Sequence, residues 1–194
     1  MTNRKRILTS IVLCAGLLGC TQAPVLKVYS LDVPKVQKIT HSSYKQKVIK
    51  VAFPQSLREQ MSQKMNFSYS HNDYGTYMNS EWSNHMSKLI QGTVIDVLDS
   101  SQLFKAVLPD TTTLKVNYRL ESNIFAFEHQ VRGKESYSVV SIQFTLIDAE
   151  TGKLVKTRRF TYIEATTTTD AKGYASATNA AIVKLSRDLV IWLR

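Results

Sequence analysis

Apolar residues recur at every third or fourth position in two long segments of the chain, with polar residues between them. In residues 79–99, spacings of four, three, four and four place Trp82, Met86, Leu89, Thr93 and Val97 on one stripe. This period is typical of an amphipathic helix whose apolar stripe faces a core. We therefore predict two helices, over residues 79–99 and from residue 170 onward, with Trp82 and Trp192 in the core that they share with a sheet.

Alternation of apolar and polar residues marks the predicted strands. A β-branched run ends at Pro54, and three later runs alternate with the period of two that a half-buried strand requires. Gly133 and Gly152 stand in the polar segments between these later runs and predict hairpin turns. Strands that are apolar on one face indicate an antiparallel sheet with one covered face. The four runs are residues 47–53, 113–127, 137–148 and 154–164.

These elements predict an α+β two-layer sandwich in the order β-α-β-β-β-α. Its sheet is expected to be mainly antiparallel, with about four strands and both amphipathic helices on one face. Residues 28–31 can add a short first strand. Residues 55–72 are polar and are predicted as a loop with one helical turn at residues 57–61. The methionine and aromatic residues of this loop fit a contact surface and a cover for the sheet edge equally well.

The start of the chain has the organisation of an export signal. Arg4, Lys5 and Arg6 form a basic region, and the 12 residues 7–18 that follow are uncharged and mostly apolar. A helix that crosses a bilayer needs about 20 apolar residues, so this stretch is too short to remain as a membrane span. Together with the small residues after it, the pattern predicts a secretory signal peptide over residues 1–19.

The end of the apolar stretch, Leu17-Leu18-Gly19-Cys20, resembles the lipobox of bacterial lipoproteins. The resemblance implies cleavage before Cys20, a diacylglyceryl group on its thiol and a third chain, such as palmitate, on its freed amine. Stable anchoring takes two chains, so this modification would hold the protein at a membrane. The alternative is an ordinary signal peptide with a chance cysteine. Cys14 does not fit a cleavage site, because Leu13 before it is too large.

The remaining chain has the size of one domain, which we expect to be a lipidated tether at residues 20–27 and a single domain at residues 28–194. The formal charge of the whole sequence is +10, and removal of Arg4, Lys5 and Arg6 leaves +7. Positive charge favours anionic lipid head groups or an acidic partner protein. Nucleic acid is not an expected partner, because an exported protein rarely meets it.

The residues that usually carry chemistry are sparse. No cysteine follows Cys20, which excludes a disulfide, a thiolate metal site and a catalytic thiol in the exported chain. The four histidines, at positions 41, 71, 85 and 129, lack the spacing of metal ligands. The sequence also contains no glycine-rich phosphate loop and no nucleophile elbow. We therefore predict no metal, no cofactor and no enzymatic activity, and an envelope hydrolase assembled from distant residues is the least favoured hypothesis.

Short aromatic and apolar motifs follow one another in a definite order. They are Tyr29-Ser-Leu31, the strand closed by Pro54, Phe67-Ser-Tyr69, Tyr77 with Glu81-Trp82, residues 98–104 with Val107, and the terminal helix at residues 177–193. In this order and spacing they resemble the ABC-type transport auxiliary lipoproteins, small outer-membrane-associated lipoproteins encoded with MCE-type lipid transporters. The resemblance covers most of the chain after Cys20.

This resemblance implies a non-catalytic role in lipid traffic. An inner-membrane permease and ATPase would work with an MCE-domain protein that bridges the periplasm, and the lipoprotein would dock or gate the far end at the periplasmic side of the outer membrane. Thr21 favours the outer membrane, since an aspartate at that position commonly signals inner-membrane retention. A homo-oligomeric ring is one assembly that the resemblance allows.

The predicted partner-binding residues are Tyr69, Tyr74 and Tyr77. The alternative function is that of an envelope lipoprotein that activates or assembles another periplasmic machine. Neighbouring permease and ATPase genes would favour the transport role.

Overall fold

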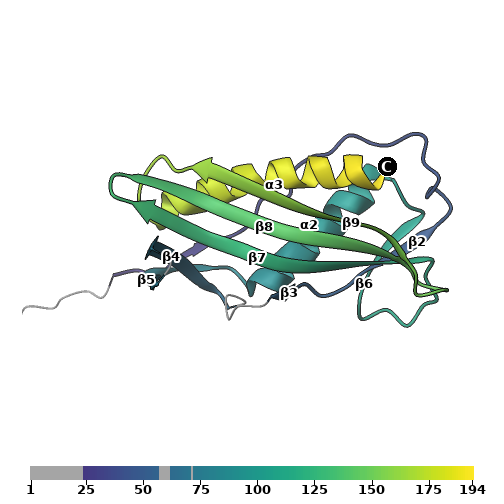
Figure 1. The fold of residues 1–194 in the computed structure, drawn as a ribbon, viewed down its shortest axis with the longest axis horizontal. Helices are drawn as coiled ribbons and strands as arrows, with labels where there is room; N and C mark the ends of the chain where they lie inside the picture. Colours follow the sequence, from purple (N-terminus) through teal and green to yellow (C-terminus); the bar gives the residue numbers. More distant parts are fainter. Residues whose placement is uncertain (1–23, 57–61, 71) are drawn as a thin grey trace, which may run out of the picture.

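The structure of the chain is a computed structural model that describes residues 24–56, 62–70 and 72–194 (Figure 1). The elements, in chain order, are β1 (Lys27–Tyr29), β2 (Val48–Val51), β3 (Gln55–Ser56), β4 (Lys64–Ser70), β5 (Asp73–Trp82), α2 (Met86–Ser101), β6 (Ala106–Pro109), β7 (Tyr118–Arg132), β8 (Glu135–Asp148), β9 (Leu154–Ala165) and α3 (Ala171–Leu193). The predicted signal peptide, Cys20 and the helical turn at residues 57–61 lie outside the described residues.

Three long antiparallel strands, β7, β8 and β9, make up the largest part of the sheet. β7 pairs with β8 from Tyr118 to Arg132, and β8 pairs with β9 along most of its length. Both connections turn at a glycine with positive φ, 62° at Gly133 and 70° at Gly152. Glycine adopts this left-handed conformation without the steric cost that a side chain would add. The two predicted hairpin turns therefore lie where the sequence places them.

The other edge of β7 is shared by three short strands that lie end to end. β2 pairs with the start of β7, β3 with its middle and β4 with its last third, and all three pairings are parallel. Outside these, β6 pairs with β2, β5 pairs with β4, and β1 pairs with β5. Figure 1 shows the result, with β4 and β5 at one end of the long strands and β2 and β6 at the other.

Both helices lie on the same face of the sheet (Figure 1). α3 packs on β8 and β9, whereas α2 packs on β2, β6 and α3. The helices and the sheet bury one apolar core, in which Phe144, Ile142 and Leu185 are almost completely inaccessible to solvent. α3 begins at Asp170, whose carboxylate accepts a hydrogen bond of 2.8 Å from the Gly173 amide, as an N-cap residue does.

The predicted sheet of about four mainly antiparallel strands, in the order β-α-β-β-β-α, is wrong. The structure has a mixed sheet of nine strands with two helices among the described residues. The main error concerns residues 64–82, which form β4 and β5, whereas residues up to 72 are predicted as a loop and those from 79 as a helix. About half of the residues of β4 and β5 are exposed to solvent, and the pairing register of the two strands shifts twice. Apolar and polar residues therefore do not alternate regularly along them.

Candidate functional site

The β4–β5 hairpin exposes large apolar and aromatic side chains to solvent. Tyr69 on β4 is 54% exposed, and Tyr74 and Met78 on β5 are 47% and 93% exposed. We call these three residues the hairpin patch. β1, which follows the predicted tether, pairs with β5, the strand that carries two of the three. Aromatic residues and methionine are enriched in the cores of protein interfaces, so this composition suits a contact surface.

Tyr77, the third predicted tyrosine, points into the molecule. Its hydroxyl lies 2.7 Å from Nδ1 of His129, and its ring packs against Phe67 at a centroid distance of 5.0 Å. Phe67 in turn packs edge-on against Tyr69 at 5.3 Å. The structure therefore connects Tyr77 to the hairpin patch through Phe67, but does not place its hydroxyl on the surface. The partner-binding role of Tyr69, Tyr74 and Tyr77 stays a prediction.

A column of aromatic rings continues from Tyr77 into the core. His129 on β7 stacks on Tyr174 of α3 with 5.2 Å between centroids and an interplanar angle of 4°. Trp82 at the end of β5 packs edge-on against Tyr174 at 5.5 Å and against Phe127 at 5.8 Å. The column joins β5, β7 and α3, so it fixes the position of the hairpin relative to the terminal helix.

The electrostatics of this column follow from its burial. Burial lowers the pKa of His129 to about 4, although the nearby carboxylate of Asp170 opposes the shift. Burial, with Asp170 and Tyr69 nearby, also raises the pKa of Tyr77 to about 12. Both groups are consequently neutral at pH 7. Nε2 of His129 is buried and has no hydrogen-bond partner among the described residues, so a proton added there would meet no acceptor.

Two further buried polar atoms flank the column. Burial raises the pKa of the inaccessible Tyr174 hydroxyl well above its ordinary value, and this hydroxyl has no hydrogen-bond partner in the described part of the chain. Glu128 accepts a hydrogen bond of 2.9 Å from Gln130 through Oε1, while its buried Oε2 has no partner among the same residues. In the part of the chain that the structure describes, no three potential metal-binding side chains gather. The column's contacts are those of a structural core, and no local pattern in the sequence predicts them.

The two tryptophans occupy different environments. Trp82 is only 1% exposed and lies within the core, although on a strand and not on the predicted helix. Trp192, near the end of α3, is half-buried and packs edge-on against Phe160 at 6.0 Å. The Lys156 ammonium lies 5.3 Å from the Trp192 ring centroid and donates a hydrogen bond of 2.8 Å to the Trp192 carbonyl. Trp192 thus covers the edge of the core between α3 and β9.

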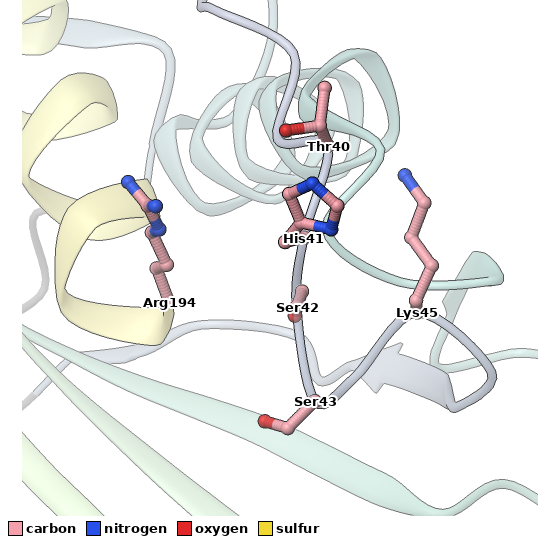
Figure 2. Close-up of a pocket in the computed structure, with 6 residues that line it drawn as sticks. All are labelled: Thr40, His41, Ser42, Ser43, Lys45 and Arg194. Carbon is pink, nitrogen blue, oxygen red and sulfur yellow. The ribbon is translucent and has the colours of Figure 1, made fainter.

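An open, polar cavity of about 550 Å³ lies at the opposite end of the molecule. Figure 2 shows Arg194 beside the end of α3, facing a loop that carries Thr40, His41 and Lys45. The Lys45 ammonium is used to hold this loop, since it donates to the carbonyls of Ile39 and Gln102 at 3.0 and 2.8 Å. Sequence reasoning missed this cavity because its two sides are about 150 residues apart in the sequence.

The anchor itself cannot be placed, because Cys20 lies outside the described residues. Within the described ranges, no helix has the length and apolar character needed to span a membrane.

Comparison with known proteins identifies relatives of this fold. No curated protein matches the chain in sequence. The chain is similar to a crystal structure of a Xanthomonas campestris protein of family DUF330, with 20% identity and a TM-score of 0.76 over 86% of this chain and 94% of that chain. It is also similar to a solved uncharacterized protein, with 14% identity and a TM-score of 0.68 over 88% of this chain and 100% of that one. At these identities the likeness shows a shared fold.

A family match is the more informative result. The family described as the ABC-type transport auxiliary lipoprotein component matches residues 29–190, from the end of β1 to the last turn of α3. The match includes the hairpin patch, the aromatic column and both helices. The chain therefore belongs to the family of ABC-type transport auxiliary lipoprotein components.

Proposed function

We propose that this protein is the non-catalytic lipoprotein of an MCE/ABC-type lipid transport system. It docks or gates the trans-envelope complex at the periplasmic side of the outer membrane, held there by lipids on Cys20. Membership of the auxiliary lipoprotein family supports the link to an ABC-type transporter. The signal sequence and the lipobox-like Leu17-Leu18-Gly19-Cys20 support the anchor, and Thr21 supports the choice of membrane.

The observation that carries the docking role is the position of the hairpin patch. Lys27, the first residue of β1, is seven positions after Cys20, and a chain of that length spans at most about 25 Å. β1 is the first strand after the lipid anchor, and it pairs with β5, which carries Tyr74 and Met78. The hairpin patch therefore lies on the strands beside the point where the tether enters the fold. A complex that crosses the periplasm and ends at the outer membrane would arrive at this part of the molecule.

Capture of a partner from envelope extracts tests the docking role. The wild-type chain should recover an MCE-domain protein, and Tyr69→Ser with Tyr74→Ser should lose most of that recovery. A matched control is Leu154→Ser with Val155→Ser, which removes two exposed apolar side chains from β9, 62% and 43% exposed. Equal losses in the two variants would show that the hairpin patch is not the contact surface.

The same capture separates the two functions. Recovery of peptidoglycan enzymes or of another envelope machine, without any MCE-domain protein, would contradict the transport role and favour the alternative function as an activator or assembly factor. Loss of the gene should also sensitise the envelope to detergents if the transport role is correct.

Fractionation tests the anchor independently of the partner. The wild-type chain should float with outer-membrane fractions in a density gradient, whereas Cys20→Ser should leave these fractions or keep its signal peptide. Light scattering of the solubilised wild-type protein would test the ring assembly, since a monomer would contradict it.

A further inference from the structure

A segment without regular structure runs from the end of β1, beside β5, across α3 to the end of the molecule opposite the hairpin patch. We call this segment, residues 30–45, the strap; Figure 1 shows it in dark blue, running toward the C-terminal end of α3. At its start, the amide of Asp32 donates to Oδ1 of Asn179 on α3 at 2.9 Å. Further along, the amide of Ile39 donates to the Ser101 carbonyl at the end of α2 at 2.8 Å. The strap is thus attached to both helices.

The middle of the strap is held less tightly. No hydrogen bond links residues 33–38 to the rest of the described chain. A groove of about 480 Å³ opens between this part and the C-terminal half of α3. Pockets that hold small ligands measure about 300–1,000 Å³, so the groove is large enough for one. We call it the α3 groove.

The lining of the α3 groove is mainly apolar. Val183 and Ile191 are eight residues apart on α3, so they lie on one stripe of the helix, and they are 48% and 64% exposed. This stripe is separate from the core-facing stripe, and such exposed side chains gain free energy when an apolar ligand covers them. The other apolar lining residues are Pro34, Val36, Ile39 and Val190.

Positive charge surrounds this apolar lining. Lys35 on the strap and Arg187 and Arg194 on the side of α3 all line the groove. One carboxylate, that of Asp188, lies beside them and accepts hydrogen bonds from the Tyr162 hydroxyl at 2.7 Å and from Arg187 at 3.2 Å. It offsets one of the three cations, and the rim keeps a net positive charge.

Beyond Arg194 the α3 groove meets the polar cavity of Figure 2, because that residue lines both. The hydroxyls of Thr40 and Ser42 and the imidazole of His41 line the far side of this cavity. An apolar groove and a polar cavity with positive charge therefore adjoin at Arg194, an arrangement complementary to an amphiphile with a negatively charged head.

We propose that the α3 groove binds a lipid with an acyl chain and an anionic head group. The chain lies along Val183 and Ile191 under the middle of the strap, and the head group lies against Lys35, Arg187 and Arg194. The site goes beyond the docking function, since it would make the lipoprotein itself a carrier of a lipid molecule. It rests on the groove alone and does not depend on which partner binds the hairpin patch.

The charge of the rim favours a lipid over a second copy of the chain. Without Arg4, Lys5 and Arg6 the chain carries a formal charge of +7, so a second copy would bring further positive charge toward a rim that is already positive. A carboxylate or phosphate head group neutralises that rim, and charge-assisted hydrogen bonds from arginine to such groups are among the stronger ones in proteins.

Photolabelling of the full chain in membrane vesicles tests the proposal. The probe is a long-chain fatty acid with a diazirine in its chain, and labelled peptides are mapped by mass spectrometry. Label is expected on residues 33–39 and 183–194. Ile191→Glu should reduce this label at least five-fold, whereas Ile163→Glu, at a position equally exposed on β9 (63%), should leave it unchanged.

Charge variants and a neutral probe test the head-group contact. Lys35→Gln with Arg187→Gln should reduce the label at least five-fold, and Lys153→Gln with Lys172→Gln, which removes the same charge elsewhere, should not. A diazirine fatty alcohol of the same length should label the groove weakly. Equal labelling by acid and alcohol, or label spread over the hairpin patch, would overturn the proposal. Crosslinks between two copies at the groove, formed by a lysine-reactive crosslinker in place of the fatty acid, would also overturn it.

Discussion

Acid should destabilise this protein through one buried imidazole, that of His129. The side chain is fully inaccessible to solvent, stacks on Tyr174 and hydrogen-bonds through Nδ1 to Tyr77. Its Nε2 has no partner among the described residues. Protonation would place a positive charge in this buried position between β7 and α3, so burial lowers the pKa of His129 to about 4.

The direction and size of the effect follow from linkage. The unfolded chain binds a proton at His129 near pH 6.5, whereas the folded chain binds it only near pH 4. The stabilisation from the neutral, stacked imidazole is therefore complete above pH 6.5 and is lost as the pH falls from 6.5 to 4. Each pKa unit corresponds to about 1.4 kcal/mol, so the free energy of unfolding should fall by about 2–3 kcal/mol between pH 7 and pH 4.5.

Nearby carboxylates do not produce the same effect in this range. Hydrogen bonds from Thr168 and Gly173 lower the pKa of Asp170, and a hydrogen bond from Tyr162 lowers that of Asp188. A carboxylate with a lowered pKa loses its stabilising contribution only as the pH falls below its unfolded value of about 4. Measurements between pH 7 and pH 4.5 therefore report mainly on His129.

Urea unfolding followed by tryptophan fluorescence measures this free energy at each pH. His129→Phe keeps a ring against Tyr174 but cannot be protonated, so its stability should vary by about 2–3 kcal/mol less than that of the wild type over this range. Tyr77→Phe keeps the imidazole and should retain the pH dependence. If the wild type and His129→Phe lose stability in parallel as the pH falls, the assignment of the acid sensitivity to His129 is wrong.

Three further substitutions test the packing. Trp82→Ala should lower the free energy of unfolding by about 3–5 kcal/mol because the ring is 1% exposed, and the same urea titration measures this loss. Asp170→Ala removes the N-cap bond to the Gly173 amide and should cost about 1 kcal/mol, which amide hydrogen exchange in the first turn of α3 would detect. Gly75→Val places a side chain where the Phe67 ring lies and should displace that ring, so partner capture should fall while Gly92→Val, in open space, leaves it unchanged.

The long strands were predictable because each has one buried face. In β8, Val140, Ile142, Phe144 and Leu146 are all buried, whereas Gln143 and Thr145 are partly exposed. Such alternation identifies a strand from sequence alone. The two hairpin turns were also predictable, because each has a glycine at a position with positive φ, which is costly for other residues.

The β4–β5 hairpin was not predictable by the same reasoning. Between Lys64 and Asn66 the partner positions on β5 jump from Glu81 to Thr76, so several β5 residues oppose a short part of β4. The extra residues interrupt the alternation. Trp82 then stands four residues before Met86, a helical spacing that arises although one residue ends a strand and the other begins α2. Local periodicity therefore favoured the wrong element.

The candidate sites depend on contacts that local patterns do not contain. Tyr77 and His129 are 52 positions apart, and they meet only because β4 pairs with the last third of β7. The sequence contains a clearer pattern for the α3 groove, since Val183, Arg187 and Ile191 are spaced four residues apart, on a stripe of α3 distinct from the stripe that faces the core. That second apolar stripe on α3 could have been found, whereas the strap that crosses it could not.

The length of β7 keeps the two proposed surfaces apart. β2 meets β7 at Tyr118, and β4 meets it at His129, eleven residues further along. At about 3.3 Å per residue these positions are about 35 Å apart, and Figure 1 places the hairpin patch and the end of α3 at opposite ends of these strands. Substitutions at sites this far apart usually act independently. Tyr69→Ser with Tyr74→Ser should therefore lose the partner and keep the acyl label, and Ile191→Glu should do the reverse; loss of both in either variant would mean that one surface serves both roles.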